Sequence, residues 1–214
     1  MASIGAFNGA GSTLVNPDTV GFKAMNFQMV NNTAFTQTNS GRTIRKGTAT
    51  TLWRATLEFP FYTQDQFREI QAFQSLARGR LNDFTVELPG ISNRKATASV
   101  STLIPNEGYD VGSTSVDVAL TGWTTGTILK AGDVIKFSNH SKVYMVTSDV
   151  TPDSAGDVQI DFAPALITAI ANDAPGTVVI DNVPFKMFMS SDTQEYQYNT
   201  DGTISYRMDV QEAI

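Results

Sequence analysis

The sequence contains no cysteine and a single histidine, His140. Disulfide bonds and thiolate metal sites are therefore excluded, and a zinc site would need mainly carboxylate ligands, which is unusual. A catalytic histidine would need a nucleophile and an orienting partner beside it. Because His140 lies in a predicted turn between Asn139 and Ser141, we expect it to have a structural or surface role.

Basic residues and long apolar runs are also scarce. The chain has 15 basic and 21 acidic residues, a net charge of −6 and a pI near 4.7. Phosphate backbones repel such a chain, so nucleic-acid binding is not expected as its main task. No run approaches the roughly 18 apolar residues that a membrane span needs, and residues 1–11 lack the basic and apolar regions of a secretory signal. We expect a soluble protein that stays in the cytoplasm until it is used or assembled.

Residues 50–90 carry a strand–helix–strand pattern. Alternation of apolar and polar residues from Thr50 to Phe59 predicts a half-buried strand. Thr63 and Gln66 fit a capping box at the start of a helix, and Gly79 is predicted to supply its left-handed end. Alternation over Asp83–Leu88 predicts a second strand. The side chains expected in the core of these elements are Trp53, Ala55, Leu57, Phe59, Phe67, Ile70, Phe73, Ala77, Phe84, Val86 and Leu88.

The pattern of apolar and turn-forming residues changes between residues 91 and 180. Short apolar runs are separated there by turn-forming Gly and Asp, which is typical of a small β-barrel. This segment has nine acidic and five basic residues and so carries −4 of the net charge. We interpret it as an inserted module. Its predicted strands are Ser115–Leu120, Asp133–Phe137, Lys142–Ser148 and Val158–Phe162.

The remaining segments flank these two regions. Residues 1–20 are small and polar, and alternation over Phe22–Val30 predicts a strand. Asn31–Gly47 is a polar stretch longer than an ordinary loop, and a long hairpin that reaches out to a neighbour fits it. Alternation over residues 183–189 and 204–210, with a turn at 199–202, predicts two final strands.

Carboxylates are scattered, and none of them forms a recognisable catalytic motif. Asp149, Asp153 and Asp157 are spaced more widely than calcium ligands and lack a terminal glutamate, so we interpret them as turn residues. Glu58 and Glu87 lie on the outward faces of two strands. A carboxylate pair could do acid–base work, but polar positions on a solvated or subunit-facing strand explain them more simply. No phosphate loop, nucleophile elbow or dinucleotide fingerprint is present. We predict no enzyme activity, no metal and no cofactor.

The order and texture of these segments resemble those of the distal-tail or minor-tail ring proteins of tailed bacteriophages, over roughly residues 20–214. The resemblance implies a ring subunit, commonly a hexamer, that joins the tail tube to the tip or baseplate. It also implies that the first domain forms the ring and that the inserted module projects from it. The segments that carry the resemblance are 53–60, 67–80, 84–89, 122–123, 129–133, 143–150, 162–166, 183–187 and 209–214.

We therefore predict a mainly β protein with one α-helix, of the α+β class. Residues 1–19 form an N-terminal arm. Residues 20–90 plus 181–214 form a β-sandwich or barrel-like ring domain, interrupted by a small inserted β-barrel at 91–180. The predicted function is that of a structural virion protein, a homo-oligomeric ring subunit in the distal tail or baseplate hub. The alternative is a carbohydrate-binding or host-recognition module of the tail tip.

The candidate interface residues are Arg42, Arg45, Lys46 and Trp123. The three basic residues would meet acidic groups on the next subunit, line a channel for passing DNA, or remain solvated. Trp123, in a glycine-flanked turn, would contact a partner or sugar, or pack within the barrel. Expected partners are copies of the chain, the tail tube protein and tail hub or baseplate proteins, with no membrane and with DNA only as passing cargo. The predicted location is the virion, after synthesis in the host cytoplasm.

Overall fold

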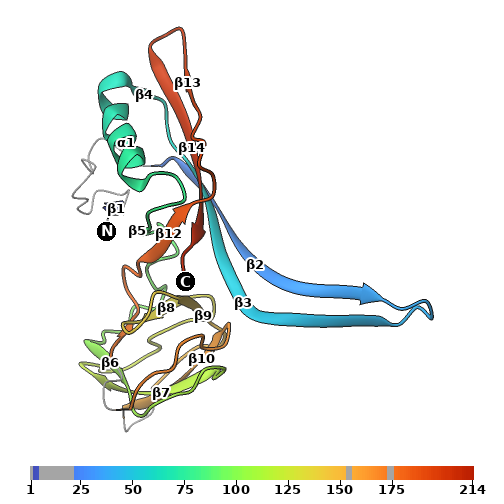
Figure 1. Ribbon diagram of the computed structural model, residues 1–214. Helices are drawn as coiled ribbons and strands as arrows, with labels where there is room; N and C mark the ends of the chain where they lie inside the picture. The colour runs from blue at the N-terminus through green and yellow to red at the C-terminus, as the bar shows by residue number, and fades with distance from the viewer. Residues whose placement is uncertain (1, 5–21, 153–155, 173–175) are drawn as a thin grey trace.

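A computed structural model describes residues 2–4, 22–152, 156–172 and 176–214 (Figure 1). Within these ranges the chain is mainly β, with one α-helix, an eight-stranded sheet and a six-stranded sheet. The predicted fold class is confirmed. Except for Ala2–Ile4, the predicted N-terminal arm at 1–19 lies outside the described residues, and so does Asp153.

The larger sheet takes strands from both ends of the sequence. Its main path runs in the order β1-β5-β12-β14-β3-β2, and β4 and β13 pair with β14. All pairs are antiparallel except β1 with β5. Strands from before residue 90 therefore hydrogen-bond directly to strands from after residue 180. The bounds are β1 Ala2–Ile4, β2 Ala24–Gln37, β3 Thr43–Glu58, β4 Tyr62–Thr63, β5 Phe84–Val86, β12 Phe185–Met189, β13 Tyr196–Tyr198 and β14 Thr203–Glu212.

The helix α1, Gln64–Ala77, packs on one face of this sheet. Every core side chain predicted for residues 50–90 is buried, and the Phe73 ring meets the Phe84 ring edge-on at a centroid distance of 5.0 Å. The Thr63 backbone N–H donates to Gln66 Oε1 at 3.1 Å, as the capping box predicts. The predicted end of the helix is confirmed in part, because Gly79 is left-handed (φ 63°) but the left-handed backbone already begins at Arg78 (φ 53°). Gly79 is still required, since a Cβ there would lie 2.7 Å from a carboxylate oxygen of Asp192.

The smaller sheet is a nearly closed antiparallel barrel. Its strand order is β11-β8-β9-β10-β7-β6, and its two end strands, β11 and β6, lie side by side. The rings of Phe137, Tyr144 and Phe162 pack together in its core, with centroid distances of 5.1 to 5.6 Å. The four predicted strands are confirmed, and β6 and β11 are additional. The bounds are β6 Thr102–Pro105, β7 Ser115–Thr121, β8 Val134–Phe137, β9 Val143–Val146, β10 Asp157–Ala163 and β11 Val178–Val179.

Buried polar contacts join the barrel to the larger sheet. Lys142, just before β9, and Glu212, at the end of β14, form an ion pair in which both side chains are fully buried (0% exposed). The Glu212 carboxylate also accepts the backbone N–H groups of Trp53 (3.2 Å) and Val143 (3.0 Å). The Trp53 indole N–H donates to the Val143 carbonyl at 2.8 Å. We call these four residues the junction; they hold the barrel against β3 and β14.

Burial shifts both charged groups of the junction toward their neutral forms. It raises the pKa of Glu212 and lowers the pKa of Lys142, and in each case the opposite charge of the partner works against the shift. The Lys142 ammonium also lies 5.5 Å from the centroid of the Trp53 ring. A buried charge of this kind persists only when it is paired and hydrogen-bonded.

The two chain segments that enter and leave the barrel are tied to each other. The Arg94 Nε donates to both carboxylate oxygens of Asp181 at 3.1 Å, and its Nη1 donates to the Ile128 carbonyl at 3.2 Å. The Asn182 backbone N–H donates to Asn93 Oδ1 at 2.9 Å. Together with the junction, these bonds fix the barrel at two separate places.

Candidate assembly surface

Strands β2 and β3 form a two-stranded ribbon that leaves the body of the molecule (Figure 1). Its lower half is anchored, because Phe27 stacks on Trp53 with a centroid distance of 5.1 Å. The register shifts between Asn31 and Thr33, and irregularities of this kind bend a ribbon. We call residues 33–47, beyond the shift, the distal hairpin. Most of the predicted polar loop is therefore strand.

Among the residues that the structure describes, the distal hairpin has no packing partner in its own chain. Of its side chains only Thr38 is partly buried; Phe35 and Ile44 are 66% and 50% exposed. On its other edge β3 pairs with β14 only from Arg54 to Glu58, so within the described residues both outer edges of the distal hairpin lack a strand neighbour. Free strand edges beside exposed apolar side chains are typical of a surface that another chain covers.

Local hydrogen bonds order the tip of the hairpin. The Thr38 hydroxyl donates to the Arg42 carbonyl at 3.1 Å and accepts the Arg42 N–H at 3.1 Å. Gly41 occupies the left-handed region at φ 81°, which the turn requires. A tip already fixed in one shape loses little conformational entropy when it binds.

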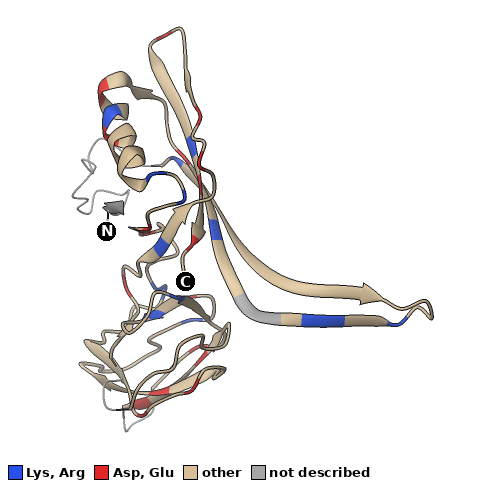
Figure 2. Cartoon of the chain, viewed as in Figure 1, with Lys and Arg blue, Asp and Glu red and all other residues tan. Residues whose placement is uncertain are grey.

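The ribbon is basic on an acidic protein. From residue 22 to residue 57 the sequence contains no Asp or Glu, while the whole chain has a net charge of −6. Figure 2 shows the contrast, with Lys and Arg along the ribbon and Asp and Glu on the body and barrel. Two distal hairpins placed side by side would therefore repel each other, and the ribbon fits a neutral or acidic surface better. The basic residues of the ribbon are Lys23, Arg42, Arg45, Lys46 and Arg54.

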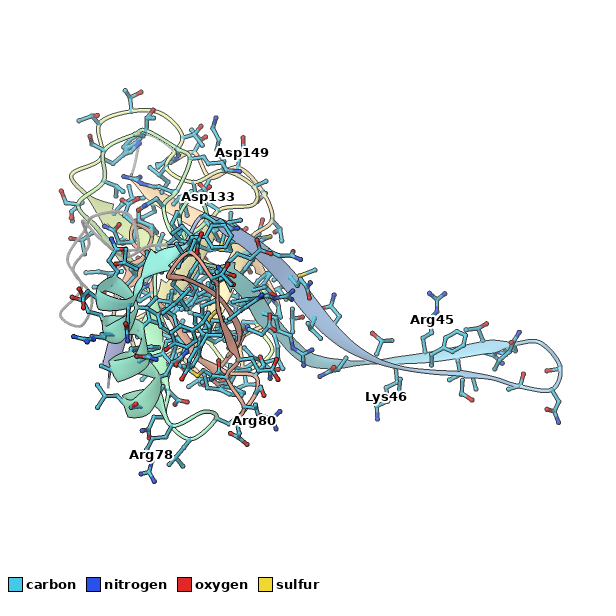
Figure 3. The ribbon with its side chains drawn as sticks, turned by 90° about the horizontal axis from the view of Figure 1, so that it is seen from above. Arg45, Lys46, Arg78, Arg80, Asp133 and Asp149 are labelled. Carbon is cyan, nitrogen blue, oxygen red and sulfur yellow. The ribbon has the colours of Figure 1, made fainter. Side chains whose placement is uncertain are left out.

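The distal hairpin has two chemically different faces. Residues opposite each other in an antiparallel pair share a face, so Phe35 lies beside Arg45 on one face. Ile44 lies on the other face, as does Lys46. Figure 3 shows Arg45 and Lys46 pointing to opposite sides of the ribbon. One face thus combines an aromatic ring with a guanidinium group, and the other combines an aliphatic side chain with an ammonium group.

The structure brings three of the four predicted interface residues together. Arg42, Arg45 and Lys46 all lie exposed on the distal hairpin, whereas Trp123 lies apart on the barrel. The Trp123 side chain packs partly against the barrel core, and its indole N–H donates to the Gly126 carbonyl at 3.0 Å. A role for any of the four in an interface stays a prediction at this point.

The residues considered for catalysis make structural contacts. His140 hydrogen-bonds to Asn139 Oδ1 (2.7 Å) and to the Tyr144 hydroxyl (2.8 Å). Burial, with the positive charges of Lys136 and Lys142, lowers the pKa of His140 to about 4, so the ring is neutral at pH 7. Across the described ranges no three His, Asp or Glu side chains gather in a way that would hold a metal.

Other carboxylates also form structural hydrogen bonds or lie exposed on the surface. Asp149 accepts the Ala131 N–H at 2.9 Å, across a turn of the barrel. Asp133, although buried, accepts the N–H groups of Lys130 (2.8 Å) and Lys95 (3.0 Å). Glu58 is exposed on β3. Asp133 and Asp149 therefore stabilise backbone turns, and Glu58 is a polar residue of the exposed surface.

Comparison with protein families gives a match on the barrel. Residues 102–178, from the start of β6 to the first residue of β11, match the family model described as distal tail protein pb9, B domain. The barrel is therefore similar to a domain of a phage distal tail protein. Over these residues the match confirms the resemblance found in the sequence, and it supports a structural role in a phage tail, as a component of the virion. A structural family of this kind favours a non-enzymatic role.

No curated protein matches the chain. In the part of the chain that the structure describes, no helix has the length and apolar character of a membrane span.

Proposed function

We propose that this chain is a ring subunit of the distal tail, which assembles with copies of itself and joins the tail tube to the tip or baseplate. The observation that carries the proposal is the distal hairpin, a basic, pre-ordered, two-stranded extension with exposed apolar side chains. It has no packing partner among the described residues of its own chain. The match of the barrel to a distal tail protein B domain supports a location in the distal tail.

The position of the hairpin favours a closed ring over a simple pair. A projection at one end of a subunit that docks on a different surface of the next subunit is a heterologous contact, and such contacts close into rings when the rotation allows. An obligate contact in such a ring buries on the order of 2,000 Å² or more. Six copies is the number that we expect from the resemblance.

The proposal divides the chain into two working parts. Residues 20–90 plus 181–214 form the ring, and residues 91–180 form a barrel that the junction holds at a fixed angle to it. Tail tube and hub or baseplate proteins would bind the two faces of the ring, and DNA would pass through its channel. Assembly is the whole of the proposed mechanism, without a catalytic step.

Light scattering after size-exclusion chromatography, with negative-stain images, tests the proposal. The full chain is expected to form a ring. A variant in which Asn-Gly replaces residues 32–50 joins the paired residues Asn31 and Thr51 through a tight turn, and it is expected to be monomeric with an unchanged melting temperature. A full chain that stays monomeric at its highest soluble concentration, with no rings in the images, contradicts the proposal.

A further inference from the structure

Two hollows on the larger sheet are candidate receptors for the distal hairpin of a neighbouring copy. The larger, of about 600 Å³, is lined by Arg54, Arg80 and Arg207 with Asp209 as its one carboxylate. Three guanidinium groups against a single carboxylate repel a basic hairpin. The larger hollow is therefore a poor receptor.

The smaller hollow, of about 370 Å³, has the complementary chemistry. We call it the aromatic groove; Phe61, Tyr196, Glu58 and Glu195 are among the residues that line it. Phe61 is 65% exposed and Tyr196 is 40% exposed. Within the described residues neither Glu58 nor Glu195 forms a side-chain ion pair or hydrogen bond.

The cations of the groove are already engaged. The Lys23 ammonium lies 5.7 Å from the centroid of the Phe61 ring, and Arg207 pairs with Asp209 at 3.4 Å. When Asp209, the partner of Arg207, is included, three carboxylates lie beside two cations, so the groove keeps a net negative charge for an incoming basic group. An aromatic ring and a guanidinium on one face of a strand match this set, since rings pack on rings and arginine pairs with carboxylates or stacks on aromatic faces. The Phe35 and Arg45 face of the distal hairpin offers both.

A single copy cannot fill its own groove. The groove lies at the base of the ribbon, where Ala24 pairs with Glu58, and the tip lies where Gln37 pairs with Thr43. The 14 residues of β2 span about 45 Å at the usual rise of a strand. Figure 1 shows the ribbon running away from the end of the sheet that bears the groove. A distal hairpin that fills the groove must therefore come from another copy of the chain.

We infer that the Phe35 and Arg45 face of each distal hairpin docks in the aromatic groove of the next subunit, with Phe35 against Phe61 and Tyr196 and with Arg45 beside Glu58 and Glu195. The inference rests on the proposed ring and names the surface that receives the hairpin. Because hairpin and groove differ, each subunit gives one contact and receives one, as ring closure requires.

The absence of cysteine allows a direct test by cross-linking. A Phe35→Cys chain mixed with a Tyr196→Cys chain is expected to give a disulfide-linked dimer on oxidation, and the double variant is expected to give a ladder that ends at the ring size. A disulfide requires Cα atoms within about 7 Å. Ile44→Cys, on the opposite face, is the matched control and is expected to cross-link to Tyr196→Cys at least tenfold less. Cross-linking of Phe35→Cys to Phe188→Cys in the larger hollow, in place of Tyr196→Cys, overturns the inference.

Charge reversal gives a second test. Arg45→Glu and Glu195→Arg are each expected to lower the ring population at least about tenfold, because like charges meet in the groove. The combined variant is expected to recover the ring to within about threefold of the original chain. Lys46→Glu, on the other face, is the matched control and is expected to leave the ring unchanged.

The outcomes separate the inference from the proposed function. Rings that form normally but show no link between positions 35 and 196, or that respond equally to Arg45→Glu and Lys46→Glu, overturn the docking site and leave the ring proposal standing. A full chain that forms no ring contradicts the proposed function itself.

Discussion

The distal hairpin and the junction use the same kinds of residue in opposite ways. Each combines basic and aromatic groups, Arg45 beside Phe35 in the hairpin and Lys142 beside Trp53 in the junction. In the hairpin both side chains are exposed, and in the junction Lys142 is fully buried and paired with Glu212. The junction is therefore expected to stabilise the single subunit, whereas the hairpin contributes to stability only when a second subunit binds.

The physical reason is solvation. Water stabilises the charge of Arg45. Replacing Arg45 by a neutral residue therefore changes the free energy of unfolding of the free subunit very little. Lys142 has lost its water and depends on Glu212, which in turn accepts N–H groups from β3 and from the first residue of β9. Removing one member of the junction leaves buried groups without partners. The following changes test the contrast, from the largest expected effect on subunit stability to the smallest.

Lys142→Met is expected to lower the free energy of unfolding by about 3–5 kcal/mol, because it leaves the Glu212 carboxylate buried without its counter-charge. Denaturant unfolding of the purified chain measures the loss. Lys142→Met combined with Glu212→Gln is expected to recover most of it, since the glutamine oxygen can still accept the N–H groups of Trp53 and Val143. A double variant as unstable as the single one would show that the charge pair itself stabilises the junction.

Trp53→Phe is expected to cost about 2–3 kcal/mol, because it leaves the Val143 carbonyl without its donor and opens a small cavity. Trp123→Phe is the matched control, since Trp123 also donates its indole N–H to a carbonyl, that of Gly126, at 3.0 Å. Trp123 is only partly buried, and water can replace its bond, so a loss of about 1 kcal/mol or less is expected. Equal losses in the two variants, measured by denaturant unfolding, would contradict the contrast between buried and half-buried bonds.

The parts of the fold that alternate in sequence were predictable. The apolar–polar alternation over Thr50–Phe59 and the helical spacing of apolar residues up to Ala77 predicted the correct elements. Both patterns arise because one face of each element packs on the core. The distal hairpin produced no such pattern, since neither of its faces is buried in the subunit. Its strands were therefore predicted as a polar loop, with a long hairpin as the suggestion that fitted.

The junction and the aromatic groove depend on contacts distant in sequence. Lys142 and Glu212 are 70 positions apart, and no local motif links them. One signal was present, because Glu212 continues the inward phase of β14 after Met208 and Val210, and a carboxylate in that phase needs a partner. For the groove, Tyr196 is brought to the same hollow as Phe61 by the pairing of β13 with β14.

Acid provides a milder test beside the junction. The pKa of His140 falls from 6.5 to about 4 on folding, first because the ring is buried and then because Lys136 and Lys142 lie near. The unfolded chain therefore takes up a proton more readily than the folded one between these two pH values, so the contribution of neutral His140 is full above about pH 6.5 and is lost as the pH falls toward 4. After allowance for partial exposure, we expect a loss of about 1–2 kcal/mol. The free energy of unfolding is measured for the original chain and for His140→Gln, each at about pH 7.5 and 4.5. The difference between the two chains isolates the contribution of His140, because the other groups titrate in both.

The smallest effect on the subunit is expected in the distal hairpin. Replacing Arg42, Arg45 and Lys46 together by Gln is expected to change the free energy of unfolding by no more than about 0.5 kcal/mol, because all three are exposed and no described residue forms an ion pair with them. The same triple variant is expected to lose the ring in light scattering, since Arg45 no longer pairs with the carboxylates of the groove. A clear loss of subunit stability would show that the hairpin belongs to the fold of the single chain. An intact ring with intact stability would show that apolar contacts and strand edges alone carry assembly.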